Sequence, residues 1–321
     1  MLYLLSLQQG HTLEDKLIRT DCQRAYLRAA ASWAVEAGLP SPVYSDSHQF
    51  PAPKAPLLPQ LQKLIDNQKN WQGPKDRKEP LTPAMVIEMA TLVASMSPDS
   101  DFAAMYDWSA LGLSTGHRRV EYAQEKRSKF QVIHVQTEDN PVPTKQPYAF
   151  MEGDFQFLDE FRRPLRGTDR AFAAYVRIRW RTQKNRVNGE TKMFARARDS
   201  RLCPVRAALR IQLRFERLQP PSRVLGVSDK GFLTASAITK FIRLTAARVL
   251  GPTATKEVLA LYTPHSIRIG ACVLLHEHGH SAIFIKNRLR WKSDTFMDYL
   301  RDTASLARKH AASLLSTLGF H

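Results

Sequence analysis

A polar segment interrupted by prolines, GPKDRKEPLTP at residues 73–83, is the feature that most restricts how this chain can fold. Its prolines do not fit the interior of a helix or of a central strand, and its charged residues favour exposure to water. Such a segment is typical of a linker between domains. We therefore predict a small domain at residues 1–74, a linker at 75–82 and a larger domain at 83–321.

The shorter part of the chain has the apolar spacing of helices. Between residues 12 and 38 apolar side chains recur at roughly helical intervals, and Gly38 followed by Pro40 marks the end. The apolar positions assigned to this helix are Leu17, Tyr26, Leu27, Ala30, Trp33 and Ala34. A proline-rich stretch leads to a second helical pattern, LLPQLQKLIDNQKNW at 57–71. The first domain is thus predicted to be a small all-helical unit.

The larger part opens with helix and later returns to it. Thr82 is a suitable N-cap for a helix that begins at Pro83, and more helix is expected at 101–129. Helical periodicity returns at residues 203–218, at 236–250 and from 265 to the C-terminus.

Between these helices lies a strand signal. The stretch AYVRIRWRT at 174–182 alternates apolar residues with Tyr and Arg, which is the pattern of a half-buried strand. KNRVNGE then turns the chain into a second strand, TKMFARA at 191–197, which predicts a hairpin with a cationic face. The fold class expected from these patterns is mainly α with a small antiparallel β-sheet.

The charge balance points to a polyanionic partner. Lys and Arg number 47 against 30 for Asp and Glu, which gives a formal net charge of +17 and a sequence pI of about 10.0. An excess of this size is typical of proteins that bind nucleic acid. A solvated basic surface or an anionic membrane surface would give the same composition, so the motifs have to decide.

Several other classes of protein are disfavoured. The three cysteines Cys22, Cys203 and Cys272 form neither a zinc-binding pair nor a disulfide framework, which favours a reducing compartment. The apolar first ten residues lack a cleavage site, and no run approaches the ~18 apolar residues of a membrane span. An intracellular location is expected: the nucleus in a eukaryote, the cytoplasm otherwise.

Two stretches supply candidate phosphate ligands. A phosphodiester under attack gains negative charge on its non-bridging oxygens, and the guanidinium fork of Arg matches them while staying protonated. In TGHRRVEYAQ at 115–124 the candidate is Arg118, with Glu121 as its orienting partner. In TPHSIRIG at 263–270, His265 and Arg268 are three residues apart on one helical face. His265 is a candidate proton acceptor and Arg268 a second phosphate ligand.

A third stretch, LRWKSDTFMDYLRD at 289–302, offers an indole N–H donor at Trp291 and a phenol at Tyr299. A phenol is a competent covalent nucleophile when cations neutralise its phosphate target. Each of these signals is weak alone, because an exposed Arg pair, a chance His-x-x-Arg or a set of core aromatics would look the same.

A candidate general acid lies in the hairpin turn. Lys184 is able to donate a proton to a departing 5′-oxygen, and Lys192 is its rival. The three histidines of HEHGH at 276–280 are close enough to raise a metal site, but Gly279 fits the end of an ordinary helix, and we expect no metal there.

Taken in order along the chain, these residues resemble the motifs of the tyrosine recombinases, also called phage integrases. LGLSTGHRRVE at 111–121 is similar to the family's T-G-x-R-x-x-E, and TPHSIR at 263–268 to its His-x-x-Arg motif. LRWKSDTFMDY at 289–299 is similar to L-G-H-S-x followed by T-x-x-x-Y. Here Trp291 stands where most members have His, and Arg290 replaces the usual Gly.

The resemblance covers roughly residues 82–303, and the helical unit before KEPLTP resembles the family's core-binding domain. The details are similar to eukaryotic transposon recombinases of the crypton type. The resemblance implies a C-shaped clamp around double-stranded DNA and a catalytic domain at 83–321, with neither a metal nor another cofactor.

For the site, the resemblance implies cleavage by Tyr299 to a 3′-phosphotyrosyl intermediate, with six catalytic residues. These are Arg118, Lys184, His265, Arg268, Trp291 and Tyr299, supported by Glu121. It also implies a tetramer around two duplexes, through a Holliday junction, with the apolar stripe in TASLARKHAASLLSTLGFH at 303–321 docking on a neighbouring subunit. Packing of that helix on its own domain is the alternative.

Two other functions remain open at this stage. A type IB topoisomerase uses the same residue types, although the small helical N-terminal unit favours a recombinase. A domesticated DNA-binding protein would keep the fold without catalysis, although every matched position here holds a chemically competent residue.

Overall fold

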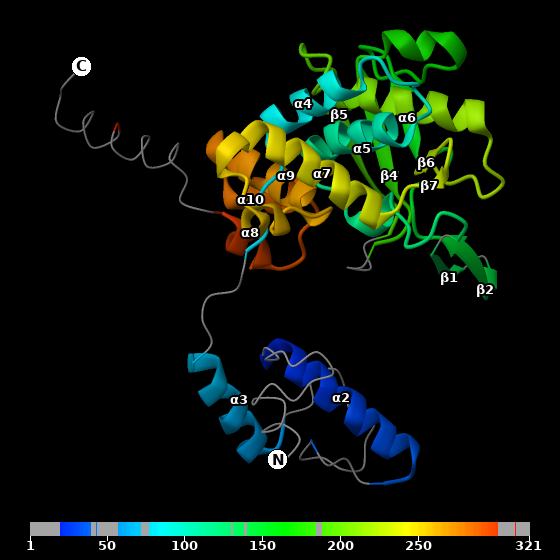
Figure 1. Ribbon diagram of the computed structural model, residues 1–321. Coiled ribbons are helices and arrows are strands. Elements are labelled where there is room, and N and C mark those ends of the chain that lie inside the picture. The colour runs from blue at the N-terminus through cyan, green and yellow to red at the C-terminus, as the bar shows by residue number, and fades with distance from the viewer. Residues whose placement is uncertain are drawn as a thin grey trace. The chain divides into compact units, whose positions relative to one another are not determined.

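The computed structural model describes residues 20–39, 43, 57–71, 77–129, 131–137, 140–183, 188–300 and 312. The chain separates into two compact units, Met1–Asp76 and Arg77–His321. The described part of the chain is mainly helical and contains small antiparallel sheets, as the sequence predicts (Figure 1).

The described helices of the smaller unit are α2 (Thr20–Glu36) and α3 (Pro59–Trp71). Their shared core consists of Leu27, Ala31, Val43, Leu61 and Ile65, all buried. The register of α2 differs from the prediction, because Tyr26 and Trp33 are 48% and 69% exposed. The buried stripe runs through Leu27, Ala31 and Ala34 instead. Leu17 lies outside the described residues.

Residues 77–82, which the sequence places in the linker, belong to the larger unit. The backbone N–H of Leu81 donates to the carbonyl of Ser266 at 2.9 Å, and that of Glu79 donates to Leu261 at 3.2 Å. Leu81 is buried, and a Cβ at Gly270 would overlap its carbonyl oxygen. The segment is polar and contains prolines, so its sequence does not indicate that Leu81 is buried and bonded to the larger unit.

The α-helices of the larger unit are α4 (Pro83–Val93), α5 (Asp101–Thr115), α6 (Pro204–Leu218), α7 (Ala235–Leu250), α8 (Lys256–Ala260), α9 (His265–Glu277) and α10 (Ala282–Arg288). Four short 3-10 helices join them: η1 (Arg119–Glu121), η2 (Gly167–Phe172), η3 (Gly251–Thr253) and η4 (Asp294–Tyr299). As expected, Thr82 caps α4, its Oγ1 accepting a hydrogen bond from the backbone N–H of Met85 at 3.3 Å.

One predicted helix is shorter than expected, and one predicted helix end is present. The helix predicted at 101–129 ends at Thr115, because Gly116 adopts a left-handed conformation with φ 55° and closes α5. Within the helical region predicted from residue 265 onward, the helix end expected at Gly279 is present: α9 ends at Glu277, and Gly279, at φ 80°, separates α9 from α10. Both breaks change the direction of the chain beside the candidate site residues. The segment at 303–321 lies outside the described residues, apart from residue 312.

The predicted hairpin is present as β4 (Tyr175–Trp180) and β5 (Glu190–Ala195), and β3 (Phe155–Leu158) adds a third antiparallel strand on the other side of β4. A second hairpin, β1 (Val132–Thr137) with β2 (Asn140–Pro147), escapes the sequence patterns because three prolines interrupt β2. A two-stranded ribbon has free edges, where proline is tolerated. A third pair, β6 (Val227–Ser228) and β7 (Gly231–Phe232), is very short.

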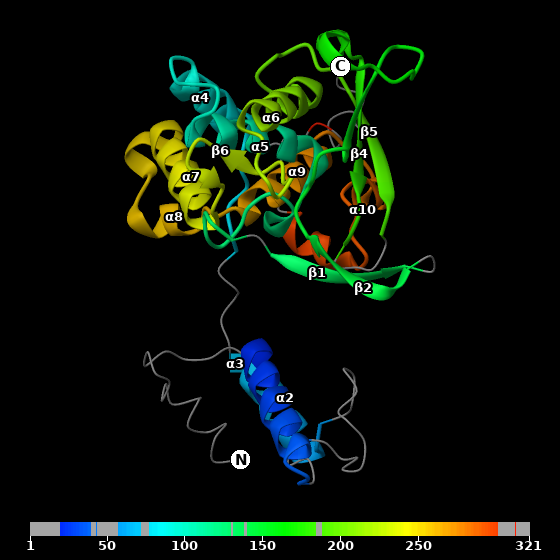
Figure 2. The same cartoon turned by 90° about the vertical axis from the view of Figure 1, so that its right-hand side faces the viewer.

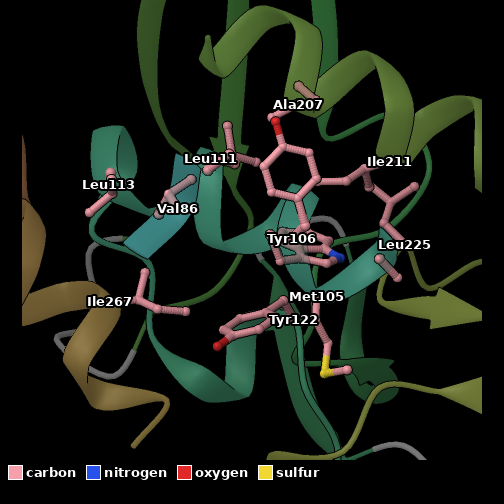
Figure 3. Close-up of a cluster of buried hydrophobic side chains, with 14 of the residues drawn as sticks. Val86, Met105, Tyr106, Leu111, Leu113, Tyr122, Ala207, Ile211, Leu225 and Ile267 are labelled. Atoms are coloured by element: carbon pink, nitrogen blue, oxygen red, sulfur yellow. The ribbon is translucent and has the colours of Figure 1, made fainter. Parts of the chain in front are cut away.

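Helix α5 forms the centre of the larger unit. Nearly all of its residues are buried, and it contacts α4, α6, α7 and α9. The ring of Trp108 stacks on Tyr122 at 5.3 Å and on Phe150 at 5.8 Å between ring centroids. Figure 3 shows part of this core, where side chains from α4, α5, α6 and α9 meet. Figure 2 shows the β4–β5 sheet on one side of the unit and α7 and α8 on the other.

No helix among the described residues has both the length and the apolar character needed to cross a membrane.

Candidate active site

An open cleft of about 520 Å³ in the larger unit brings together residues from distant parts of the sequence. It is lined by Arg118, Arg119, Val120, Thr263, Pro264, His265, Arg268, Trp291 and Tyr299. Five of the six predicted catalytic residues are therefore neighbours, and none of these nine lining residues is acidic. The sixth, Lys184, lies outside the described residues.

Tyr299 and His265 are in direct contact across the cleft. The hydroxyl of Tyr299 lies 3.1 Å from Nε2 of His265, and the two rings meet edge to face with centroids 5.4 Å apart. Tyr299 ends η4, which is anchored on α9 by the buried ring of Phe296, and His265 is the first residue of α9. The pair has the geometry for proton transfer from the phenol to the imidazole.

The surroundings of His265 favour its neutral form. Desolvation of the imidazole, together with the positive charge of Arg268, lowers the pKa of His265 below its ordinary value. A neutral imidazole at physiological pH has a free nitrogen lone pair. His265 is therefore able to act as a proton acceptor for Tyr299.

Arg268 is buried behind these two residues, one helical turn along α9. Its guanidinium donates to the carbonyl of Gly116 and, at 3.0 Å, to that of Leu289, and it packs 4.0 Å from the ring centroid of Trp291. Burial, with the nearby charges of Arg118 and Arg290, lowers the pKa of Arg268 to about 9. The group thus remains protonated at neutral pH and places a fixed positive charge at the cleft.

Arg118 comes from the turn that follows α5. Its Nη1 donates to Glu121 Oε1 at 3.2 Å, and its backbone N–H donates to Glu121 Oε2 at 2.9 Å. The expected pairing of Arg118 with Glu121 is therefore present. The Arg118 side chain remains 20% exposed, so it reaches the cleft while its partner is buried.

Glu121 is the anchor of this part of the site. Burial alone would raise the pKa of its carboxyl, but Arg290 and Arg118 outweigh that effect and lower the pKa to about 2. Its Oε2 also accepts a hydrogen bond from the indole of Trp180, on β4, at 3.2 Å. The carboxylate is therefore ionised at every physiological pH.

Trp291 lies between Arg268 and Tyr299, with its ring centroid 5.6 Å from that of Tyr299. Its indole Nε1 is buried and has no hydrogen-bond partner among the described residues. A buried donor without a partner is costly, and Trp291 lines the cleft, so its indole N–H is a candidate ligand for an incoming anion.

Two residues of the site do not stand out in the sequence. Trp180 belongs to the apolar face of a predicted strand, and Arg290 stands where the resemblance expects glycine. In the structure both contact Glu121. No periodicity signals such a role, because it depends on a contact between segments more than fifty residues apart.

Neither lysine considered as the general acid lines the cleft among the described residues. Lys192, the rival of Lys184, pairs with Glu190 at 2.9 Å on β5 and does not line the cleft. On either side of residues 184–187, the backbone N–H of Gln183 donates to Asn188 Oδ1 at 2.9 Å.

Neither a protein-family model nor a curated protein matches the sequence. Solved structures to which the fold is similar include the XerA recombinase, with 16% identity over 97% of this chain and 88% of that one and a TM-score of 0.44. The Tn1549 transposon integrase in complex with transposon right-end DNA has 16% identity over 98% and 83%, with a TM-score of 0.46. The XerH site-specific recombinase bound to its difH substrate has 13% identity over 97% and 76%, also at 0.46. At these values the function has to be inferred from the chemistry of the site.

Proposed function

We propose that this protein is a site-specific DNA recombinase that cuts and rejoins DNA through a covalent link to Tyr299. The observation that carries the proposal is the contact of the Tyr299 hydroxyl with His265 at 3.1 Å in a cleft that also holds Arg118 and Arg268. A nucleophile, a neutral base and two fixed cations are the parts needed for attack on a phosphodiester. The sequence resemblance to the tyrosine recombinases supports the same reading.

In the first step, the Tyr299 oxygen attacks the scissile phosphorus while its proton passes to Nε2 of His265. The P–O5′ bond breaks, which leaves a 3′-phosphotyrosyl link and a 5′-oxygen that takes up a proton from Lys184. Resealing is the reverse: a 5′-hydroxyl from the partner strand attacks the phosphorus and Tyr299 recovers its proton. The number of phosphoester bonds is unchanged, so no nucleotide is consumed.

The charge of the site suits the transition state of this reaction. The phosphorane formed during attack carries about two negative charges on its non-bridging oxygens. Arg118, Arg119 and Arg268 line the cleft without any acidic neighbour in its lining, and the buried carboxylate of Glu121 pairs with Arg118 and Arg290 behind it, so positive charge is in excess at the cleft. Arg118 and Arg268 border the cleft directly, and the indole N–H of Trp291 supplies an uncharged donor.

The wider assignments belong to this proposal as well. The unit at residues 1–76 is proposed as a core-binding domain and the unit at 77–321 as the catalytic domain, together gripping double-stranded DNA. A tetramer joined through the segment at 303–321, a Holliday junction intermediate, a role in a mobile element and action in the nucleus or nucleoid are proposed with it. The net charge of +17 supports a DNA partner.

The direct test is a covalent protein–DNA band on a denaturing gel, obtained with nicked suicide substrates from the ends of the element that encodes the protein. We expect a 3′-linked adduct with the wild type and none with Tyr299→Phe. Tyr175→Phe is the matched control, because Tyr175 is a half-buried tyrosine at the start of β4 that does not line the cleft.

Each other outcome selects a different function. An adduct that persists in Tyr299→Phe would show that another residue is the nucleophile. Relaxation of supercoils without strand exchange between sites would favour a type IB topoisomerase. Tight, salt-sensitive DNA binding with no adduct would favour a catalytically inactive DNA-binding protein.

A further inference from the structure

Arg290 occupies an unusual position directly before Trp291. Its backbone is left-handed, with φ 59°, a conformation that favours glycine, and its side chain is almost completely buried. Both the conformation and the burial of a guanidinium are unfavourable on their own. A side chain kept under these conditions must make strong compensating contacts.

The contacts of Arg290 lead straight to Glu121. Nη1 and Nη2 donate to the two carboxylate oxygens, each at 3.3 Å, which is the two-pronged pairing that arginine makes with a carboxylate. The guanidinium also lies 3.8 Å from the ring centroid of Trp180. Arg290 is therefore held between an aromatic face and an ion pair.

Through Glu121, Arg290 acts on the cleft. The same carboxylate accepts two hydrogen bonds from Arg118. Arg118 lines the cleft, but Arg290 does not. The carboxylate of Glu121 thus lies between Arg118, on the cleft side, and the buried Arg290. By holding Glu121, Arg290 fixes the orientation of Arg118.

A second contact extends to the β4–β5 hairpin. Nη1 of Arg290 donates to Gln183 Oε1 at 3.2 Å. Gln183 in turn bonds to Asn188 at 2.9 Å and, through its Nε2, to Glu190 at 2.8 Å. These three residues, the base of the hairpin turn, lie on either side of residues 184–187, and Arg290 holds them through its hydrogen bond to Gln183.

We infer that Arg290 is a positioning residue for strand cleavage: it fixes the phosphate-binding Arg118, through Glu121, and the base of the hairpin turn relative to Trp291. This inference rests on the proposed function. It assigns a role to a position where the resembling family has glycine, and it explains why the side chain at 290 is buried in this chain.

The test measures formation of the Tyr299 adduct in a single turnover at saturating DNA. Arg290→Lys keeps a cation but loses the two-pronged fork, and Arg290→Gly removes the side chain and the backbone strain. The matched control is Arg214→Lys, because Arg214 is equally buried and pairs with the buried carboxylate of Asp107, but lines a different pocket on α6.

We expect both Arg290 variants to form the adduct about 10- to 100-fold more slowly, the usual cost of losing a supporting contact behind a reactive group. The Kd for DNA should change by less than about threefold, because Arg290 is buried and does not line the cleft. Arg214→Lys should cleave at the wild-type rate. Urea unfolding of all three variants shows how much folded protein each assay contains.

A second substrate distinguishes the effect of Arg290 on Arg118, through Glu121, from its effect on the base of the hairpin turn. With sulfur in place of the scissile 5′-oxygen, the leaving thiolate needs no proton donor, since a thiol is far more acidic than an alcohol. If Arg290 holds the turn as well as Glu121, the loss of rate in Arg290→Lys shrinks on this substrate without vanishing. An equal loss on both substrates would remove the turn from the inference.

The inference as a whole is overturned if the Arg290 variants cleave at the wild-type rate, or if their loss of rate matches their loss of folded protein. These results differ from failure of the proposed function, in which the wild type itself forms no adduct with either substrate and Arg290 has no cleavage to serve.

Discussion

Replacing Glu121 by Gln should test whether one buried carboxylate organises the arginines of the site. Glu121 is 2% exposed and accepts hydrogen bonds from Arg118, Trp180 and Arg290. Glutamine keeps the shape of the side chain but removes its charge and turns one acceptor into a donor. Arg290, which is as deeply buried, would lose its counter-charge.

The magnitude follows from the pKa of Glu121. It lies at about 2 in the folded chain against an ordinary value of 4.5, and each pKa unit corresponds to about 1.4 kcal/mol. The ionised carboxylate therefore stabilises the folded state by about 3 kcal/mol over the neutral form, in the range expected when one partner of a buried ion pair is removed. We expect Glu121→Gln to lower the free energy of unfolding at pH 7 by that amount.

The sign of the pH dependence follows from the lowered pKa. The stabilisation by Glu121 is fully present above pH 4.5 and is lost as the pH falls toward 2. Urea unfolding at several pH values should thus show a difference between wild type and Glu121→Gln that is constant near neutrality and shrinks in acid. Glu216→Gln is the control, because Glu216 pairs with Arg170 at 2.6 Å but is 38% exposed, and such pairs contribute less than about 1 kcal/mol.

Equal stability of Glu121→Gln and wild type at pH 7 would refute this reasoning. It would mean that the charge of Glu121 is not needed to hold Arg118 and Arg290, and that water or another group compensates them in solution.

Two further outcomes follow from the structure. Because the pKa of His265 is lowered, the rate of adduct formation should remain constant as the pH falls past 6.5 and should drop only at lower pH, where His265 becomes protonated. The variant His265→Gln should lack this drop. A wild-type rate that falls with a midpoint at pH 6.5 or above would contradict the lowered pKa. Gly270→Ala would place a methyl group against the carbonyl of Leu81 and should lower the free energy of unfolding in urea by about 3 kcal/mol, near the upper end for overpacking. Gly251→Ala is the control: a Cβ there meets no other atom, although the φ is 57°, and the loss of stability should be smaller. Equal losses would show that Leu81 moves to make room for the methyl group.

Local patterns were sufficient for the helices and the central hairpin. The N-cap at Thr82, the helix at 204–218 and the β4–β5 pair all follow from residues close together in the sequence. The expectation failed where a single residue redirects the chain, as Gly116 does at the end of α5. It also failed at β2, where prolines conceal a strand that has no neighbour on one side.

The candidate site was predictable in its chemistry but not in its support. Arg118, His265, Arg268, Trp291 and Tyr299, which line one cleft, were singled out because each carries a reactive or charged group within a short motif. Glu121 was found only because it lies three residues from Arg118. Trp180 and Arg290 contact Glu121 only in the folded chain. The residues next to them in the sequence do not distinguish Trp180 from any aromatic residue of a strand, or Arg290 from any exposed arginine.

The hydrogen bond from Leu81 to Ser266 gives the molecule a mechanical property. Ser266 follows His265 at the start of α9, so Leu81, which belongs to the hydrophobic core, is bonded to the chain directly beside the candidate base. A displacement of Leu81 would therefore act on the core and on the first turn of α9 together. We expect the contact between His265 and Tyr299 to respond to substitutions at Leu81, although Leu81 does not line the cleft.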